Sequence, residues 1–186
     1  TLQNTSIPQD GYISSANSFS AIKISNINPE LAGLPVPKTE LIKWKSFDGM
    51  EIEGLLTYPL NYVSGKKYPF ILNIHGGPAG SFNESFIANS GIYPLASIAE
   101  NDIFILRPNP RGSNAYGLKF RLANHRDWGG GDYKDLMAGV DYVISKGWAD
   151  PDKMGVMGWS YGGFMSSWVV GHTNRFKVAS IGAPVV

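Results

Sequence analysis

Short apolar runs alternate with a helical pattern through the central and C-terminal parts of the chain. The runs at 70–74, 103–106 and 154–159 have the length and the β-branched or aromatic content of strands that are buried on both faces. Residues 132–146 instead carry apolar side chains at helical spacing, with acidic residues in the first turn and Gly147 directly after the last. Strands that alternate with helices predict an α/β fold.

The segments between these runs favour a doubly wound, mostly parallel sheet. Residues 93–100 predict a helix between the strands at 70–74 and 103–106, and a unit of this length implies a right-handed parallel crossover. Residues 164–172 predict a further helix, and 178–181 predict one more strand. The resulting order, β-α-β-α-β-α-β, is typical of the doubly wound class.

A β-hairpin is expected before this region. Strands are predicted at 40–46 and 50–58, because Asp48-Gly49 between them is a strong signal for a tight turn. Residues 1–36 lack helical periodicity and carry turn-forming residues around short extended pieces. Leu34-Pro35-Val36-Pro37 favours an extended linker, so we place a domain boundary near residue 36.

Two later segments are expected to be irregular. Asp150-Pro151-Asp152-Lys153 predicts a turn into the strand at 154–159. Residues 107–131 are too many for a simple connection, and long loops in compact domains usually have a functional role. Gly129-Gly130-Gly131 fits neither common phosphate-binding pattern, so we expect a loop leading into a helix rather than an anion site.

Composition limits the classes of partner. A formal net charge of +1 without a basic patch argues against binding to nucleic acid or to an acidic membrane surface. No apolar run approaches the length of a transmembrane span. The absence of cysteine excludes disulfides and thiolate zinc sites within these residues. We expect no metal and no cofactor, and we take the cytoplasm as the default location, whereas the oligomeric state is left open.

Gly158-Trp159-Ser160-Tyr161-Gly162-Gly163 marks a sharp turn from a strand into a helix. In such a G-x-S-x-G turn the serine is lifted out of the sheet, with a strained backbone and an exposed hydroxyl. Gly158 and Gly162 leave room for the turn to close. The helix directs its positive end at Ser160, so this serine is a candidate nucleophile and the amide of Tyr161 a candidate donor to an oxyanion.

The context of this motif decides its interpretation, because a serine between glycines is also common in ordinary loops. A nucleophile elbow needs a second oxyanion donor from an earlier strand-to-helix loop. The predicted strand at 70–74 ends in His75-Gly76-Gly77-Pro78, which is where that loop is expected. The two motifs together favour a serine hydrolase over a structural glycine turn.

The chain resembles the prolyl oligopeptidase family of serine peptidases, and most closely its acylaminoacyl-peptidase and dipeptidyl-peptidase-like branches. The resemblance covers residues from about 38 to 186. It rests on Ser46-Phe47-Asp48-Gly49, Ile52-Glu53-Gly54, His75-Gly76-Gly77-Pro78, Asn109-Pro110-Arg111-Gly112-Ser113, Tyr116-Gly117, the segment from Trp128-Gly129 to Asp135, and Gly158-Trp159-Ser160-Tyr161-Gly162-Gly163.

This resemblance implies an α/β-hydrolase fold for residues 37–186, here expected as the N-terminal part of a peptidase domain that is incomplete at its C-terminus. Residues 1–36 would then be the last, short β segment of a preceding β-propeller together with a linker. The expected partner is a short peptide substrate, since the propeller of this family admits only short or flexible peptides.

The resemblance also implies roles for individual residues. Ser160 would attack the scissile carbonyl, and the amides of Gly77 and Tyr161 would hold the oxyanion. The Tyr161 side chain would help to form a wall of the substrate pocket. Arg111 would bind a substrate carbonyl or, as the favoured alternative, form an ion pair that fixes the long loop, and a structural role is also expected for Asp127 and Trp128.

The general base and its acid partner are missing from the expected places. In α/β-hydrolases the acid and then the histidine follow the serine along the chain, yet no Asp or Glu follows Ser160. The one later histidine, His172, would lie in the helix behind the elbow and point away from it. His75 belongs to the oxyanion loop, and His125 lies in the long loop without an acid in the correct order. We therefore expect both missing groups in sequence outside these 186 residues.

Three functions remain open at this point. The first is a serine peptidase, present here as a fragment without its full triad. The second is a carboxylesterase or another α/β-hydrolase, which would usually carry a helical lid in place of a propeller. The third is a catalytically inactive interaction domain, which loss of the acid or the histidine from later sequence would favour.

Overall fold

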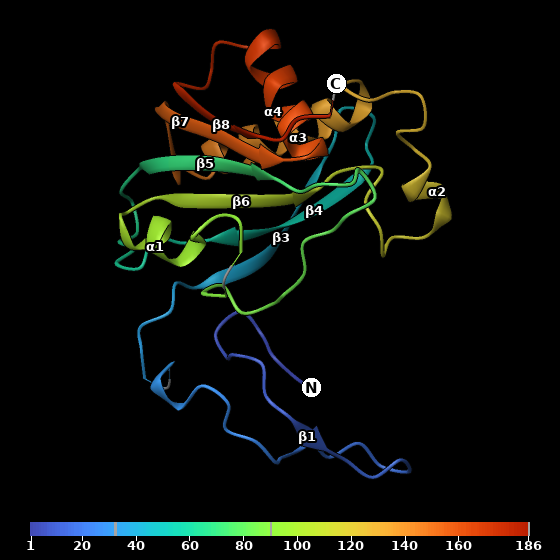
Figure 1. Cartoon of the computed structure of the whole chain (residues 1–186). Helices are drawn as coiled ribbons and strands as arrows, with labels where there is room; N and C mark the ends of the chain where they lie inside the picture. The colour runs from blue at the N-terminus through green and yellow to red at the C-terminus, as the bar shows by residue number, and fades with distance from the viewer. Residues whose placement is uncertain (32, 90, 186) are drawn as a thin grey trace.

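The computed structural model describes residues 1–31, 33–89 and 91–185, and a six-stranded sheet forms its centre (Figure 1). The strand order is β3-β4-β6-β5-β7-β8. Neighbouring strands among β5, β6, β7 and β8 pair in parallel, whereas β3, β4 and β6 are joined by antiparallel pairs. The strand bounds are β3 Thr39–Lys45, β4 Glu51–Thr57, β5 Tyr68–Ile74, β6 Phe104–Asn109, β7 Ala149–Trp159 and β8 Val178–Gly182.

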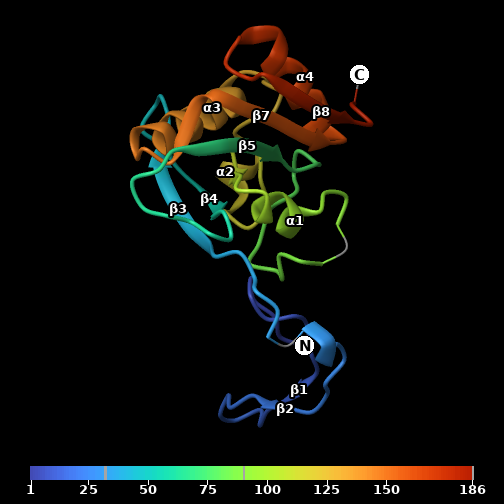
Figure 2. The same ribbon diagram turned by 90° about the vertical axis from the view of Figure 1, so that its left-hand side faces the viewer.

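Helices cover both faces of this sheet (Figure 2). On one face, α3 (Gly131–Ser145) and α4 (Tyr161–His172) share a large apolar core with the strands. On the other face, α1 (Leu95–Glu100) buries Ala99 against Ile105 of β6. The α/β fold with a mostly parallel sheet, predicted from the alternating pattern, is therefore confirmed.

Strand β6 shows why the sequence of a central strand can be a run of consecutive apolar residues. Phe104 and Leu106 belong to the core shared with α3 and α4, whereas Ile105 belongs to the cluster with α1. Successive side chains point to opposite faces, and both faces are covered by helices. Apolar residues therefore occupy the consecutive positions 104–106 rather than alternate ones.

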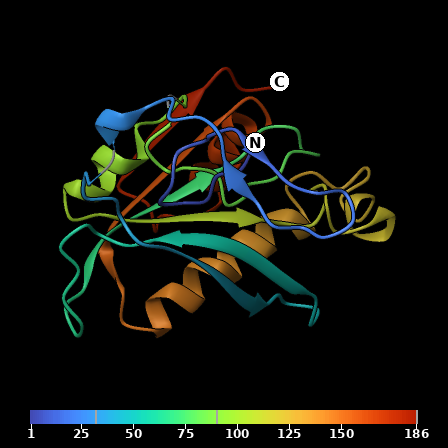
Figure 3. The ribbon, with the colours of Figure 1, turned by 90° about the horizontal axis from the view of Figure 1, so that it is seen from below.

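The predicted hairpin is present and is docked on α3, which runs alongside it (Figure 3). Lys45 of β3 pairs with Glu51 of β4, and Gly49 in the turn has a φ of 82° that favours glycine. The indole Nε1 of Trp44 donates a hydrogen bond to the Asp135 carbonyl of α3 at 3.0 Å. This bond joins the antiparallel edge of the sheet to the helix layer.

The N-terminal segment lies below the sheet in Figure 1 and extends away from it. It contains the two-stranded antiparallel sheet β1 (Tyr12–Ile13) and β2 (Ile22–Lys23), followed by a short 3-10 turn at Pro29–Leu31. Among the described residues 1–31 and 33–36 there is no α-helix. The assignment of residues 1–36 to the end of a β-propeller stays a prediction.

Two segments differ from the sequence-based expectation. The residues expected to turn at 150–153 belong to β7, but its pairing with β5 passes from Ala149 directly to Met154, so the turn-forming residues bulge out of the ladder. The segment 107–131 is shorter as a loop than expected, because β6 continues to Asn109 and a one-turn helix, α2 (Leu118–Arg121), follows. Within the described residues, no helix is both long and apolar enough to span a bilayer.

We predict that Gly139→Ala lowers the free energy of unfolding by roughly 1–3 kcal/mol, because it overpacks a filled site. A Cβ at Gly139 of α3 would lie 2.7 Å from Trp44 Cζ2, and the hydrogen bond to Asp135 holds that indole in place. The matched control is Gly171→Ala in α4, where a Cβ would meet nothing within 4 Å. The better helix propensity of alanine should make that variant more stable by up to about 1 kcal/mol.

Both values can be measured by chemical denaturation of the product of the complete reading frame. Equal effects of the two substitutions would contradict the close packing of α3 on the hairpin.

Candidate active site

Ser160 lies at the sharp turn between β7 and α4. Its backbone has φ 61° and ψ −121°, a conformation that non-glycine residues rarely adopt and that is typically strained. The Ser160 N–H donates to the Gly182 carbonyl of β8 at 3.0 Å, and α4 begins with Tyr161 directly afterwards. The side chain of Ser160 is partly exposed, so the hydroxyl is held at the C-terminal edge of the sheet and is reachable from outside.

Glycines make this turn possible because three backbone segments meet behind it. A Cβ at Gly158 would lie 2.3 Å from the Gly162 carbonyl oxygen. A Cβ at Gly162 would lie 2.1 Å from the Ile74 carbonyl oxygen of β5, and one at Gly163 would lie 2.4 Å from that of Gly182. Distances this short exclude any side chain, so the first turn of α4 packs directly against the ends of β5 and β8.

The loop that follows β5 passes over the elbow. A Cβ at Gly76 would lie only 3.5 Å from the Ser160 Cβ, which measures how closely the loop approaches the serine. Gly77 has a φ of 132°, a conformation that favours glycine. Neither the Gly77 N–H nor the Tyr161 N–H donates to a backbone carbonyl in the described part of the chain. Two uncommitted amide donors therefore lie on the segments that flank the serine.

A second loop, at 109–116, holds the first one in place. His75 Nε2 and Ser113 Oγ are hydrogen bonded at 2.9 Å, and the Asn114 N–H donates to the Gly80 carbonyl at 3.1 Å. The Asn109 side chain accepts from the Phe82 N–H at 2.7 Å and donates to the Phe82 carbonyl at 3.0 Å. The loop after β5 is thus fixed at several points by groups at the end of β6 and in the loop that follows it.

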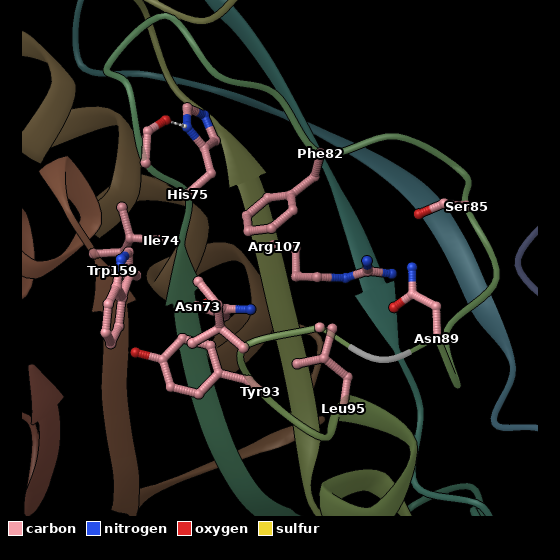
Figure 4. A pocket seen from close by; sticks show the side chains of 13 residues that line it. Asn73, Ile74, His75, Phe82, Ser85, Asn89, Tyr93, Leu95, Arg107 and Trp159 are labelled. Atoms are coloured by element: carbon pink, nitrogen blue, oxygen red, sulfur yellow. Dashed lines mark hydrogen bonds between the residues drawn. The ribbon is translucent and has the colours of Figure 1, made fainter. Parts of the chain in front are cut away.

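A pocket of about 260 Å³ opens beside the elbow (Figure 4). Trp159 and Gly76, the neighbours of the serine and of Gly77, both line it. Its remaining walls come from the ends of β5 and β6 and from the segment before α1, and they include Asn73, Phe82, Ser85, Asn89, Tyr93 and Arg107.

Comparison with known proteins identifies a family for this chain. Residues 90–186, just over half of the chain, match the family described as the prolyl oligopeptidase family. The chain belongs to this family.

Relatives within the family are peptidases. The chain is 40% identical to the peptidase YuxL of Bacillus subtilis over 141 residues, which cover 75% of this chain and 21% of that protein. It is 33% identical to dipeptidyl-peptidase 5 of Schizosaccharomyces pombe over 160 residues, covering 83% of this chain and 23% of the relative. The chain therefore spans between a fifth and a quarter of the length of these relatives.

The fold agrees with that of a solved peptidase structure. An acylaminoacyl peptidase in complex with Z-Gly-Gly-Phe-chloromethyl ketone matches with a TM-score of 0.85 at 27% identity, over 97% of this chain and 28% of that one. The implied α/β-hydrolase fold of a family peptidase is thereby confirmed.

Tyr161 occupies a different environment from the one expected for a pocket wall. Its side chain is fully buried, and its hydroxyl donates to Asp132 Oδ2 at 2.5 Å. Burial raises the pKa of the Tyr161 phenol, and burial also raises the pKa of the Asp132 carboxyl. The Asp132 carboxylate also accepts from the Gly129 and Tyr133 N–H groups, at 2.9 and 2.8 Å. These contacts anchor the residue whose amide flanks Ser160; a substrate contact of its side chain stays a prediction.

Arg111 forms ion pairs of the kind expected under the favoured alternative, in which it fixes the long loop. Its guanidinium donates to Asp135 through Nε at 2.9 Å and through Nη2 at 2.8 Å, and it pairs with Asp48 of the hairpin turn at 3.0 Å. The bonds to Asp135 raise the pKa of Arg111, so the group stays charged. Arg111 therefore links the long loop, α3 and the β3–β4 turn.

Asp127 and Trp128, for which a structural role is expected, also make contacts in this region. The Asp127 carboxylate accepts from the Gly131 N–H at 2.9 Å, at the start of α3. Trp128 packs edge-on against the Tyr161 ring with centroids 5.1 Å apart. Both residues therefore support the helix starts around the elbow.

None of the three histidines has its ring bonded to Ser160 in the part of the chain that the structure describes. His172 lies at the opposite end of α4 from the serine, stacked on Trp168 at 3.9 Å, and His125 is exposed in the long loop. His75 is near the elbow, but both of its ring nitrogens are engaged, with the Gly76 carbonyl at 2.8 Å and with Ser113.

Sequence reasoning missed several residues that shape this site. Asn109 and Asp132 lie within stretches that we quoted as motifs, but their hydrogen bonds join segments that are far apart along the chain. Arg107 was treated as the start of a loop, whereas it is the fourth residue of β6 and is buried in the wall of the pocket. An arginine directly after an apolar run was the one available signal.

We predict a pH effect on stability that arises from His75. Burial lowers the pKa of its imidazole below the usual 6.5, so the unfolded chain binds the proton at higher pH than the folded one. The free energy of unfolding should then fall as the pH drops below about 6.5 and towards the folded pKa. His75→Gln should remove this component, whereas His125→Gln, at an exposed position, should keep it.

Thermal melts of the product of the complete reading frame between about pH 5 and 7.5 would measure the difference. The idea fails if His75→Gln and the wild-type protein lose stability in parallel as the pH falls.

Proposed function

We propose that Ser160 is the nucleophile of a serine peptidase that cleaves short peptides through an acyl-enzyme. The observation that carries this proposal is the placement of Ser160 on a strained, partly exposed elbow with the Gly76-Gly77 segment directly over it. A hydroxyl on a strand-to-helix turn beside a glycine-rich loop is the arrangement in which α/β-hydrolases perform acyl transfer.

The proposed chemistry uses two amide donors of this chain. Ser160 Oγ attacks the peptide carbonyl carbon while a general base takes the hydroxyl proton, and the carbonyl oxygen becomes an oxyanion held by the Gly77 and Tyr161 N–H groups. The C–N bond then breaks as the proton passes to the leaving amine, and water hydrolyses the acyl-serine by the same steps. Each such donor typically contributes about 2.7–4 kcal/mol to stabilising the transition state.

We place the general base and its acid partner outside these 186 residues. The argument is chain order, since no Asp or Glu follows Ser160 and the rings of the three histidines are engaged or distant. The short span of the chain relative to its relatives is compatible with this placement.

Cleavage of peptides is favoured over hydrolysis of small esters. The described residues before the linker form a small antiparallel sheet rather than a helical lid, which is the difference expected between a peptidase with a propeller and an esterase. The relatives are named as peptidases as well. An inactive interaction domain is the alternative that the next experiment excludes or supports.

Ser160→Ala in the product of the complete reading frame should lower turnover of short peptide aryl-amides by roughly a millionfold, as loss of the nucleophile does in a comparable triad. Ser145→Ala, at an exposed position near the end of α3, is the control and should keep full activity. A Ser160→Ala protein that folds and retains turnover would refute the assignment. A wild-type protein that hydrolyses only aryl esters would favour the esterase, and one that hydrolyses neither would favour the interaction domain.

The 186-residue chain made alone should react with a fluorophosphonate probe at Ser160 far more slowly than the product of the complete reading frame. Without a general base the serine hydroxyl stays protonated near neutral pH, so only the oxyanion donors assist the reaction. Mass spectrometry of the labelled peptide would give both rates. Equal rates, together with a cooperative melt of the isolated chain, would show that a base lies within these residues.

A further inference from the structure

Arg107 is a buried cation that forms no ion pair within the described residues. It lies on β6 with only 3% of its surface exposed. Its Nε and Nη2 atoms are buried and have no hydrogen-bond partner in the described ranges 1–31, 33–89 and 91–185. Burying an unpaired charge costs free energy, so a group in this state calls for a partner, such as an ordered water, an ion or a ligand group.

The contrast with Arg111 shows that this is a local feature. Arg111 lies four residues further along and is bonded to the carboxylates of Asp135 and Asp48. Arg107 forms no ion pair with any carboxylate among the described residues, and its guanidinium lies over the ring of Phe82 at 5.6 Å instead. Within the described residues, the guanidinium of Arg111 is therefore paired with two carboxylates, whereas that of Arg107 is unbonded.

The unbonded guanidinium faces the pocket beside the elbow. Figure 4 shows the Arg107 side chain running beneath Phe82 towards Asn89, in the same hollow that Trp159 and Gly76 line. About 260 Å³ is room for several water-sized groups and is enough for the side chain of an acidic residue. A group bound at this guanidinium thus shares one pocket with the neighbours of Ser160.

The electrostatics suit an anionic group. Burial lowers the pKa of Arg107 to about 10, which still leaves the guanidinium charged near neutral pH. Phe82 lies against the guanidinium, and a carboxylate is the group that can accept two parallel bonds from the donors along a guanidinium edge. Asn73, Ser85 and Asn89 add neutral polar groups to the walls of the pocket and no competing negative charge.

We propose that this pocket is a carboxylate subsite in which Arg107 binds an acidic side chain of the peptide that is cleaved at Ser160. The proposal rests on the proposed function, and it makes peptides with Asp or Glu close to the cleaved bond the preferred substrate class. Arg107 selects the substrate in this scheme and takes no part in the chemical step.

The test uses the product of the complete reading frame and internally quenched peptides. In these peptides Glu or Gln occupies, in turn, each of the two positions before and after the cleaved bond. The wild-type protein should cleave the Glu peptide at least about tenfold better in kcat/KM at one of these positions, since a bond to a charged group discriminates by this order. Arg107→Met should abolish the preference while leaving the Gln peptides within about threefold of wild type, and Arg107→Lys should retain part of it.

A matched control addresses general electrostatic effects. Arg121→Met removes a positive charge from an exposed position in α2 and should keep the full preference for Glu. N-acetylglutamate should inhibit cleavage by the wild-type protein more strongly than N-acetylglutamine does, which tests the subsite even if Arg107→Met fails to fold.

Failure of this proposal is distinguishable from failure of the proposed function. Cleavage that depends on Ser160 but does not discriminate Glu from Gln overturns the subsite alone. The same result with a lower melting temperature for Arg107→Met shows that Arg107 stabilises the folded protein instead, and it also overturns the proposal. Cleavage that survives Ser160→Ala overturns the proposed function.

Discussion

The contact between the first turn of α4 and the end of β5 is the constraint on which the site depends. The helix approaches so closely that a side chain at Gly162 would overlap the Ile74 carbonyl. This approach brings the elbow and the loop after β5 within a few ångströms of each other. Because the backbone of Ser160 is strained, the surrounding packing must hold it, and the glycines supply that packing by removing side chains where backbones meet.

Buried polar groups extend this constraint to the rest of the domain. Asp132 and Asp135 lie in the first turns of α3, where the helix dipole favours negative charge. One accepts from Tyr161 beside the nucleophile, and the other from Arg111 of the loop after β6. Groups buried in this way must be bonded to offset the loss of hydration, so they specify a single arrangement of α3, the elbow and the long loop.

Arginines four residues apart on one segment illustrate how little the local sequence says about their environment. Both lie beside proline, yet one is bonded to two carboxylates and the other lines a pocket, with two donors that are unbonded within the described residues. The difference comes from the layers of the fold: α3 presents Asp135 to Arg111, whereas Arg107 shares the opposite face of the sheet with Ile105 and lines the pocket there. For the same reason the resemblance to a family could suggest a role for Arg111, whereas no motif pointed to Arg107.

By itself, the sequence determined the α/β class, the β3–β4 hairpin, the α3 helix and the elbow at Ser160, because each depends on the period of apolar residues or on glycines at short range. The tertiary structure alone decided the burial of the Tyr161 side chain, the bonds that Asn109 makes to the loop after β5, and the pocket around Arg107. These features join residues that are far apart along the chain, and their free energy depends on which groups are desolvated together. Such desolvation is a property of the packed layers and leaves no periodic signal in the sequence.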